Sequence, residues 1–261
     1  MSDALIEARG IDVAIGRHLV LRDLSFALRP GEFAVLTGPN GAGKTTLLKA
    51  LAGLLPVQSG HVGPHARKPG EIAYLEQGGR IYWPMSVRDI VALGRLPFGA
   101  ALQRLSPDDH EAIETALLDC GLSALSDRPA SSLSGGEVAR VLMARALAVR
   151  APVLLVDEPI ASLDPARQIA TMQVLERQAR RGGAVLAVLH DLPLALRFAD
   201  RVVVMDGGRI AADAAPQEIL ASKTLDRVFG LEFQFEGVGR DLLLTPRIGS
   251  STSAPGPGDR V

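Results

Sequence analysis

A glycine-rich stretch ending in a lysine and two threonines is the first part of this 261-residue sequence that could do chemistry. It follows the apolar residues 33–36 and precedes residues 47–51, which have the composition of a helix. The spacing GxxxxGK[ST] between a strand and a helix wraps backbone N–H groups around the phosphates of a nucleotide. The residues of this phosphate loop that we expect to contact nucleotide are Gly38, Pro39, Asn40, Gly41, Ala42, Gly43, Lys44, Thr45 and Thr46.

Each part of the phosphate loop has a physical reason to bind an anion. Glycine adopts backbone angles closed to other residues and leaves no Cβ between the main chain and the ligand. The first N–H groups of the following helix, with its dipole, favour negative charge. We expect Lys44 to reach the β- and γ-phosphates and the Thr45 hydroxyl to ligate Mg²⁺. The strand-turn-helix context argues against the alternative, a glycine-rich turn with a solvated lysine.

Two carboxylates, Asp157 and Glu158, follow the apolar residues 153–156. The ends of parallel strands face the ligand crevice of an α/β sheet. We therefore expect Asp157 to hold Mg²⁺ through water and Glu158 to polarise an attacking water. Charged groups directly after four apolar residues are costly to bury without a cation or hydrogen bonds, which disfavours the alternative of a solvated acidic turn.

A serine and two glycines at another helix start form a second candidate anion site. Its residues are Ser134, Gly135, Gly136 and Glu137. The hydroxyl and the backbone N–H groups are expected to point at one place. One phosphate loop has no obvious need of a second anion site in the same chain, and taken alone an ordinary helix cap explains this motif equally well.

Composition restricts the classes of partner. The formal net charge of −1 and the 4% of aromatic residues lack the basic face and stacking surfaces typical of nucleic-acid-binding proteins, so we expect no nucleic-acid partner. Cys120 is the single cysteine and is expected to be a small buried apolar residue. The N-terminus lacks the pattern of a signal peptide, and no apolar segment is long enough to cross a bilayer. These features predict a cytoplasmic protein that reaches a membrane only through a partner.

The apolar pattern places the motifs on alternating strands and helices around a helical insert. Strands are expected at residues 71–77 and 184–189 and a hairpin at 202–209. Helices are expected to begin after Ser86, which would cap a helix ending at Gly94, and after Ser106. The predicted nucleotide-binding α/β core is discontinuous and comprises residues 1–83 and 151–247. The predicted helical subdomain comprises residues 84–150, and a disordered tail is predicted at 248–261.

Taken together, these motifs resemble the nucleotide-binding subunits of ATP-binding cassette (ABC) transporters over nearly the whole chain. The family's elements occur in order: the phosphate loop, Gln77 after a strand, the signature at Ser134, the pair Asp157 and Glu158, Asp164 after Ser162 and Leu163, and His190 after an apolar strand. The resemblance implies an α/β fold with a P-loop NTPase core, an N-terminal antiparallel β subdomain and an inserted helical subdomain.

The resemblance also implies roles for these residues in a head-to-tail homodimer. The signature of one copy would close over ATP and Mg²⁺ held by the phosphate loop of the other. Gln77 would sense Mg²⁺ and the attacking water, His190 would contact the γ-phosphate, and Asp164 would bridge the two sites. Outside that context, Gln77 is a polar strand end, His190 a structural histidine and Asp164 a helix cap.

Two positions depart from the family pattern. Ile15, before Gly16, occupies the place of an aromatic residue that stacks on adenine, so phosphate contacts should carry more of the nucleotide affinity. Glu137 stands where glutamine is usual, and we expect it to be tolerated because the serine and backbone groups make most of the phosphate contact.

The stretches at residues 83–97 and 214–230 look like those of importers of iron-siderophore, haem and cobalamin complexes. The implied partners are polytopic permease subunits docking on the helical subdomain and a periplasmic substrate-binding protein. Peripheral attachment to the cytoplasmic face of the inner membrane is expected. Rival hypotheses are a zinc or manganese importer, an exporter, a soluble ABC ATPase acting on ribosomes or DNA, and a scaffold without hydrolysis, which the presence of Glu158 and His190 disfavours.

Overall fold

The computed structural model describes residues 4–63, 68–81, 84–100, 102, 104–161, 163–237 and 241–247. The predicted disordered tail at 248–261, together with Ser162, Tyr82 and Trp83, lies outside the described residues.

The central sheet has six strands in the order β5-β6-β7-β3-β8-β9. The first five are parallel, and β9 is antiparallel to β8. Every residue of β3, β6 and β7 is buried, which explains why these strands are continuous apolar runs. The strands are β3 Phe33–Thr37, β5 Ile72–Leu75, β6 Val153–Asp157, β7 Ala184–Val188, β8 Arg201–Asp206 and β9 Arg209–Ala214.

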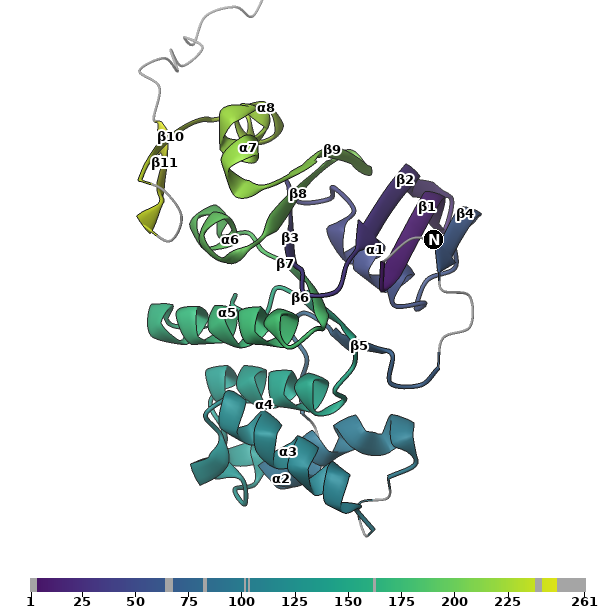
Figure 1. Cartoon of the computed structure of the whole chain (residues 1–261), viewed down its shortest axis with the longest axis vertical. Coiled ribbons are helices and arrows are strands. Elements are labelled where there is room, and N and C mark those ends of the chain that lie inside the picture. The colour runs from purple at the N-terminus through teal and green to yellow at the C-terminus, as the bar shows by residue number, and fades with distance from the viewer. Residues whose placement is uncertain are drawn as a thin grey trace, which may run out of the picture.

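A three-stranded antiparallel sheet in the order β2-β1-β4 forms the N-terminal β subdomain, at the right of Figure 1. Helix α1 lies between it and the central sheet, and leucines of α1 share one core with both sheets. The residues of the phosphate loop thus run between two sheets. The elements are β1 Ile6–Ile15, β2 His18–Leu28, α1 Lys44–Leu51 and β4 Ser59–Gly63.

A helical layer inserted between β5 and β6 forms the lower part of Figure 1. Ser86 and Ser106 cap their helices as predicted. The expected end at Gly94 is wrong, because α2 passes into the 3-10 helix η1. Gly94 instead allows close packing, since a Cβ there would lie 2.3 Å from the Arg145 carbonyl oxygen. The elements are α2 Val87–Ala92, η1 Leu93–Phe98, α3 Pro107–Asp119, η2 Ser123–Leu125, η3 Ala130–Ser132 and α4 Gly135–Ala148.

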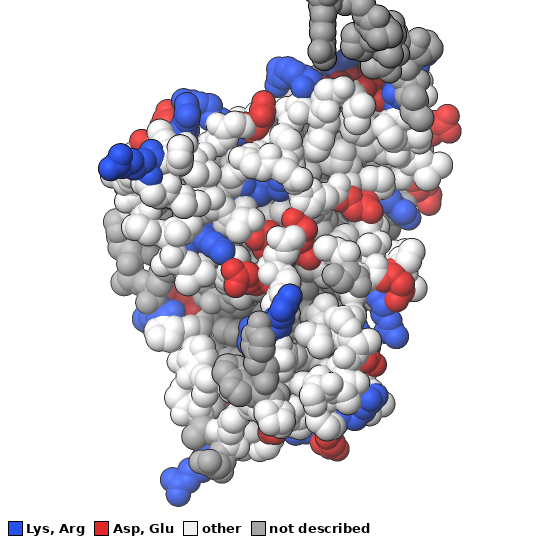
Figure 2. All heavy atoms as spheres, turned by 180° about the vertical axis from the view of Figure 1, so that it is seen from behind, with Lys and Arg blue, Asp and Glu red and all other residues white. Residues whose placement is uncertain are grey.

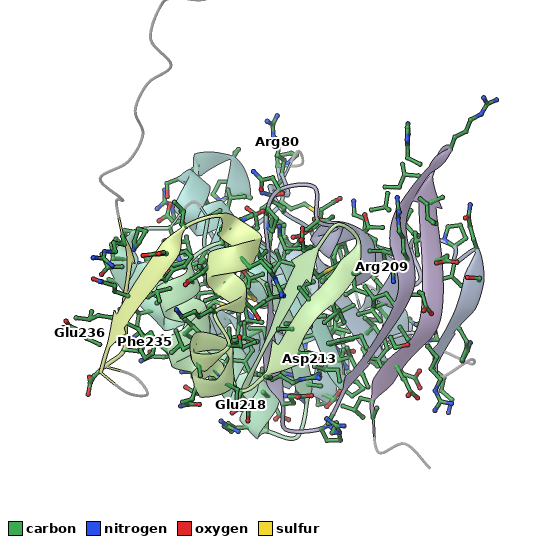
Figure 3. All side chains as sticks on the ribbon, turned by 90° about the horizontal axis from the view of Figure 1, so that it is seen from above. Arg80, Arg209, Asp213, Glu218, Phe235 and Glu236 are labelled. Atoms are coloured by element: carbon green, nitrogen blue, oxygen red, sulfur yellow. The ribbon has the colours of Figure 1, made fainter. Side chains whose placement is uncertain are left out.

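The C-terminal part packs a third apolar core against β8, at the top of Figure 1. Figure 3 places Arg209 and Asp213 at opposite ends of β9, with Phe235 on a separate hairpin beyond the short C-terminal helices. The sequence did not predict this hairpin, β10 paired with β11. The elements are α6 Leu192–Phe198, α7 Pro216–Ala221, α8 Thr224–Phe229, β10 Glu232–Glu236 and β11 Leu243–Arg247. Helix α5, Pro165–Arg180, packs instead in the core that the central sheet shares with the helical layer.

The predicted fold class is confirmed: an α/β core with an antiparallel N-terminal sheet and an inserted helical subdomain. Cys120 is buried as expected. Within the described residues, no helix combines the length and apolar character needed to cross a membrane. Figure 2 shows acidic and basic side chains interspersed on one face of the molecule, with several acidic ones near its middle.

Candidate active site

The phosphate loop turns sharply from β3 into α1 through glycines with positive φ. The φ angles of Gly38, Gly41 and Gly43 are 144°, 80° and 99°. A Cβ on Gly38 would lie 2.2 Å from the Met205 carbonyl oxygen, and one on Gly43 would lie 2.8 Å from Cδ2 of Leu21. The loop is therefore seated against β8 and β2, and its first and last glycines are required by the surrounding fold.

Lys44 begins α1 and points back over the loop that precedes it. Its ammonium donates hydrogen bonds to the carbonyl oxygens of Gly38 and Pro39, both at 2.8 Å. Burial lowers the pKa of Lys44, while the charges of Glu158 and Asp157 oppose that change. Among the described residues, no side chain caps the N-terminus of α1, so the first N–H groups of this helix remain available to an anion. A lysine and a set of N–H groups thus converge on one small region.

Asp157 ends β6 in a position where its carboxylate is only 1% exposed. Neither of its oxygens has a hydrogen-bond partner among the residues that the structure describes. Burial raises the pKa of Asp157, and the nearby Thr45 hydroxyl opposes this shift. A buried, unpaired carboxylate beside a hydroxyl is an oxygen donor set that fits Mg²⁺. Two of the three predicted metal contacts, Thr45 and Asp157, therefore lie together at the end of the sheet.

Glu158 leaves the sheet in a left-handed conformation with φ of 49°, which is rare for a residue other than glycine. Its N–H donates to the Val188 carbonyl oxygen of the neighbouring strand at 3.2 Å. Its two carboxylate oxygens are both engaged. Gln77 donates to Oε2 from Nε2 at 2.6 Å, and Nε2 of His190 lies 2.7 Å from Oε1.

The three predicted catalytic side chains share one cleft with the phosphate loop. Its volume is about 430 Å³. Parallel register explains the convergence: Leu75 pairs with Val156, and Asp157 pairs with Val188, so the residues that follow these strands meet at one edge of the sheet. The cleft is lined by Val20, Asn40, Gly41, Gly43, Lys44, Thr45, Thr46, Gln77, Glu158 and His190.

Two residues at this edge were not found from the sequence. Val20 of β2 lines the cleft. The Tyr74 hydroxyl is buried and has no hydrogen-bond partner in the described part of the chain, and burial, followed by the charge of Asp157, raises its pKa. The sequence signal for Tyr74 was its position three residues before the predicted site residue Gln77. Its place near Asp157 follows only from the sheet register, which pairs β5 with β6.

The predicted signature lies at the N-terminus of α4. Ser134 caps the helix, and Gly135, Gly136 and Glu137 form its first turn. A Cβ on Gly135 would meet nothing within 4 Å. Gly135 lines a second cleft, between the helical layer and the core, which also touches Gln77 and Glu158 but does not include the phosphate loop.

The structure does not bring the remaining predicted site residues into these two clefts. Asp164 caps α5 by accepting a hydrogen bond from the Arg167 N–H at 3.0 Å. Ile15 ends β1 opposite His18, and its side chain is 54% exposed. Within its own chain Asp164 is therefore a helix cap, and Ile15 is an exposed strand end.

Comparisons with known proteins agree with this geometry. The family model for ABC transporters matches residues 21–161. The hemin import ATP-binding protein HmuV of Rhodococcus jostii is 42% identical over 234 residues, covering 86% of this chain and 80% of the relative. The HmuV of Streptomyces coelicolor is 40% identical, covering 87% of this chain and 84% of the relative.

This chain belongs to the ABC transporter family. It is a nucleotide-binding ABC ATPase, as the motifs predicted.

Solved ABC structures have the same fold. A metal-chelate-type ABC transporter in an inward-facing conformation has a chain 25% identical to this one, with a TM-score of 0.81, covering 94% of this chain and 98% of that one. A nucleotide-free ATP-binding cassette is 26% identical with a TM-score of 0.71, covering 87% and 95%. The family resemblance to importers of iron chelates is thereby confirmed.

Proposed function

We propose that this ABC ATPase powers uptake of an iron chelate, with hemin as the favoured cargo, as a head-to-tail homodimer attached to separate permease subunits. The observation that carries the catalytic part is the Glu158 carboxylate, held by Gln77 and His190 in the cleft of the phosphate loop. The cargo is suggested by the relatives named for hemin import.

Glu158 is the proposed general base. A carboxylate fixed by two neighbours keeps one orientation toward a water molecule that enters the cleft, and its oxygens can accept the proton which that water loses. Gln77 lies in the segment that joins β5 to the helical layer, so a movement of that layer would change its contact with the Glu158 carboxylate. His190 is proposed to leave its bond to Glu158 and donate to the γ-phosphate.

Lys44 and the N–H groups of α1 are proposed to hold the β- and γ-phosphates. Because Lys44 now bonds two carbonyl oxygens of its own loop, it exchanges those partners for phosphate oxygens when nucleotide enters. Thr45 and Asp157 would hold Mg²⁺, with Gln77 as a further contact. The ion, when bound, would neutralise charge that develops on the phosphates.

A second copy of the chain is proposed to complete the site. Glycine weakens a helix by about 1 kcal/mol relative to alanine, yet Gly135 lies in the first turn of α4, where a Cβ would meet no atom of the described residues within 4 Å. A phosphate approaching from outside would account for that choice. Asp164 is proposed to lie across the interface between the copies.

The membrane partners follow from the proposed import function. Permease subunits would dock on the helical layer at the cytoplasmic face of the inner membrane, and a periplasmic binding protein would deliver the chelate. A zinc or manganese importer is the second candidate, but the relatives named above favour hemin.

Replacing Glu158 by glutamine tests the catalytic assignment. Glu158→Gln should still bind ATP but hydrolyse it on the order of 10²–10⁴ times more slowly, because the amide cannot accept the proton. An ATP-dependent dimer should then accumulate and be visible by size-exclusion chromatography. Glu218→Gln, at an exposed position on α7, is the matched control. Turnover by Glu158→Gln at the rate of the unchanged protein would refute the role of Glu158.

The same variant tests the cargo in cells. When Glu158→Gln replaces the native chain, the organism should lose growth on hemin as its iron source while growth on a ferrous salt continues. Normal growth on hemin, combined with failure under zinc limitation, would favour the second candidate.

A further inference from the structure

The signature of this chain is bonded to its own Glu137. The Ser134 hydroxyl donates to Oε2 of Glu137 at 2.9 Å, and the Ser134 N–H donates to the same oxygen at 2.8 Å. In return, the Glu137 N–H donates to Oγ of Ser134 at 3.4 Å. Together these bonds form a capping box in which serine and glutamate bond each other reciprocally.

The capping box uses the donors that the signature would offer to a phosphate. A serine hydroxyl has a single proton to donate, and Glu137 accepts it. The backbone N–H of Ser134 is committed to the same carboxylate. A phosphate that reaches this helix start therefore finds the N–H groups of Gly135 and Gly136 and, beside them, a carboxylate in place of the hydroxyl donor.

The carboxylate is also charged, and within the described residues it forms no ion pair with a lysine or arginine. The hydrogen bonds from the Ser134 backbone and side chain, followed by Arg128 and Arg140, lower the pKa of Glu137. Both arginines make their hydrogen bonds elsewhere. Arg128 donates to Ser132, and Arg140 donates to the carbonyl oxygens of Cys120 and Gly121.

The capping box of α3 shows what the same motif looks like in a structural role. There Asp109 bonds Ser106, but its carboxylate is buried and forms an ion pair with Arg95 at 2.7 Å. Its charge is neutralised inside the protein. Glu137 is instead partly exposed, at the place where the proposed dimer would receive a phosphate.

We propose that Glu137 is a positioning residue that opposes closure of the dimer over a nucleoside triphosphate. It keeps the Ser134 hydroxyl bonded within its own chain and places a negative charge beside the incoming terminal phosphate. Closure requires Ser134 to exchange the carboxylate for the phosphate, so Glu137 sets the nucleotide concentration at which two copies associate. This inference rests on the proposed head-to-tail dimer.

Glu137→Gln is the discriminating variant, because glutamine keeps the capping box and removes the charge. It is combined with Glu158→Gln so that ATP is not consumed. The ATP concentration giving half-maximal dimer, measured by analytical ultracentrifugation, should fall about tenfold at low salt, since removal of one nearby like charge has an effect of that order. The ratio of these ATP concentrations between the Glu158→Gln parent and the double variant should shrink to about twofold in 1 M salt, where the Debye length is about 3 Å.

A role in capping alone would give a different result. Loss of a cap changes thermal stability, but its effect on the ATP concentration for dimerisation should not depend on ionic strength. Glu137→Ala, which loses both the charge and the cap, should also dimerise at lower ATP despite a lower melting temperature. In proteins that retain Glu158, Glu137→Gln should lower the KM for ATP about tenfold with kcat changed less than about twofold.

Two outcomes overturn the inference, and they are distinguishable. If the Glu158→Gln parent dimerises with ATP and adding Glu137→Gln leaves the midpoint unchanged, or shifts it equally at both salt concentrations, only the role of Glu137 fails. If the parent stays monomeric at saturating ATP, the head-to-tail dimer itself fails, and the inference fails with it.

Discussion

The phosphate loop and the signature are both glycine-rich helix starts suited to anions, yet the chain treats them differently. Gly38 is packed so closely that a Cβ would overlap the Met205 carbonyl oxygen. Gly135 has open space around its Cα. Lys44 is 7% exposed and bonded within its loop, whereas Ser134 lies at the surface and is bonded by the Glu137 carboxylate.

The difference separates two reasons for a glycine. At Gly38 the requirement comes from the chain's own fold, because the backbone of β8 fills the space where a side chain would be. At Gly135 the described part of the fold makes no such requirement, which supports our proposal that the requirement comes from a phosphate that approaches from outside. On this proposal, the first helix start supplies most of the contacts to the phosphates, and the second forms half of a site that another copy completes.

Substituting alanine at each glycine is the strongest test of this contrast. Gly38→Ala should lower the free energy of unfolding by at least about 3 kcal/mol, because it adds a clash to a strained φ. Gly135→Ala should raise it by up to about 1 kcal/mol, since alanine is the better helix former. The same variant should hydrolyse ATP on the order of 10² times more slowly, because the methyl group obstructs phosphate contact. Denaturant unfolding and ATPase assays measure both. A destabilised Gly135→Ala, or one with full activity, would break the comparison.

Asp157→Asn tests whether the unpaired charge of Asp157 destabilises the fold at the end of the sheet. Removing this charge should raise the free energy of unfolding of the nucleotide-free protein by about 2 kcal/mol at pH 7. The same change should abolish Mg²⁺-dependent hydrolysis. The pKa of Asp157 is raised by burial, so its charge destabilises the fold only above the ordinary value of 3.8. The difference in stability should therefore shrink as the pH falls below the raised pKa of folded Asp157 and vanish below 3.8, where the carboxyl group is protonated in folded and unfolded chains alike. Asp127→Asn, with its side chain 93% exposed, is the control. Equal stability of Asp157→Asn and the parent at pH 7 would contradict this account.

Ile15→Tyr tests how far phosphate contacts alone carry nucleotide affinity. Ile15 and His18 pair across a tight hairpin, and Val20, two residues beyond His18, lines the cleft. A tyrosine at 15 should tighten ATP binding about tenfold by stacking on the base. Binding of tripolyphosphate, which has no base, should not change. Leu19→Tyr is the control, because Leu19 lies on β2 between His18 and Val20 and faces the opposite side of that strand. It should leave both affinities unaltered when they are measured by calorimetry. Equal gains for ATP and tripolyphosphate would show that position 15 does not contact the base.

The sequence predicted the elements whose signals are local. Strand-turn-helix spacing located the phosphate loop, apolar runs located β3, β6 and β7, and serine followed by acidic residues located the helix starts at Ser86 and Ser106. It failed where the meaning of a residue depends on a distant neighbour. Gly94 looked like a helix end but permits contact with α4, and the β10–β11 hairpin was missed because Pro246 argues against a strand away from a sheet edge.

By itself the sequence determined the chemical groups, their order along the chain and the family, since these depend on residue type and short-range spacing. Only the tertiary structure decided that Gln77 and His190 hold the two oxygens of Glu158 and that Glu137 bonds Ser134. It also decided that Asp157 has no hydrogen-bond partner among the described residues. The reason is physical. Parallel register brings the ends of strands distant in sequence to one edge of the sheet, and burial there sets which charges are paired.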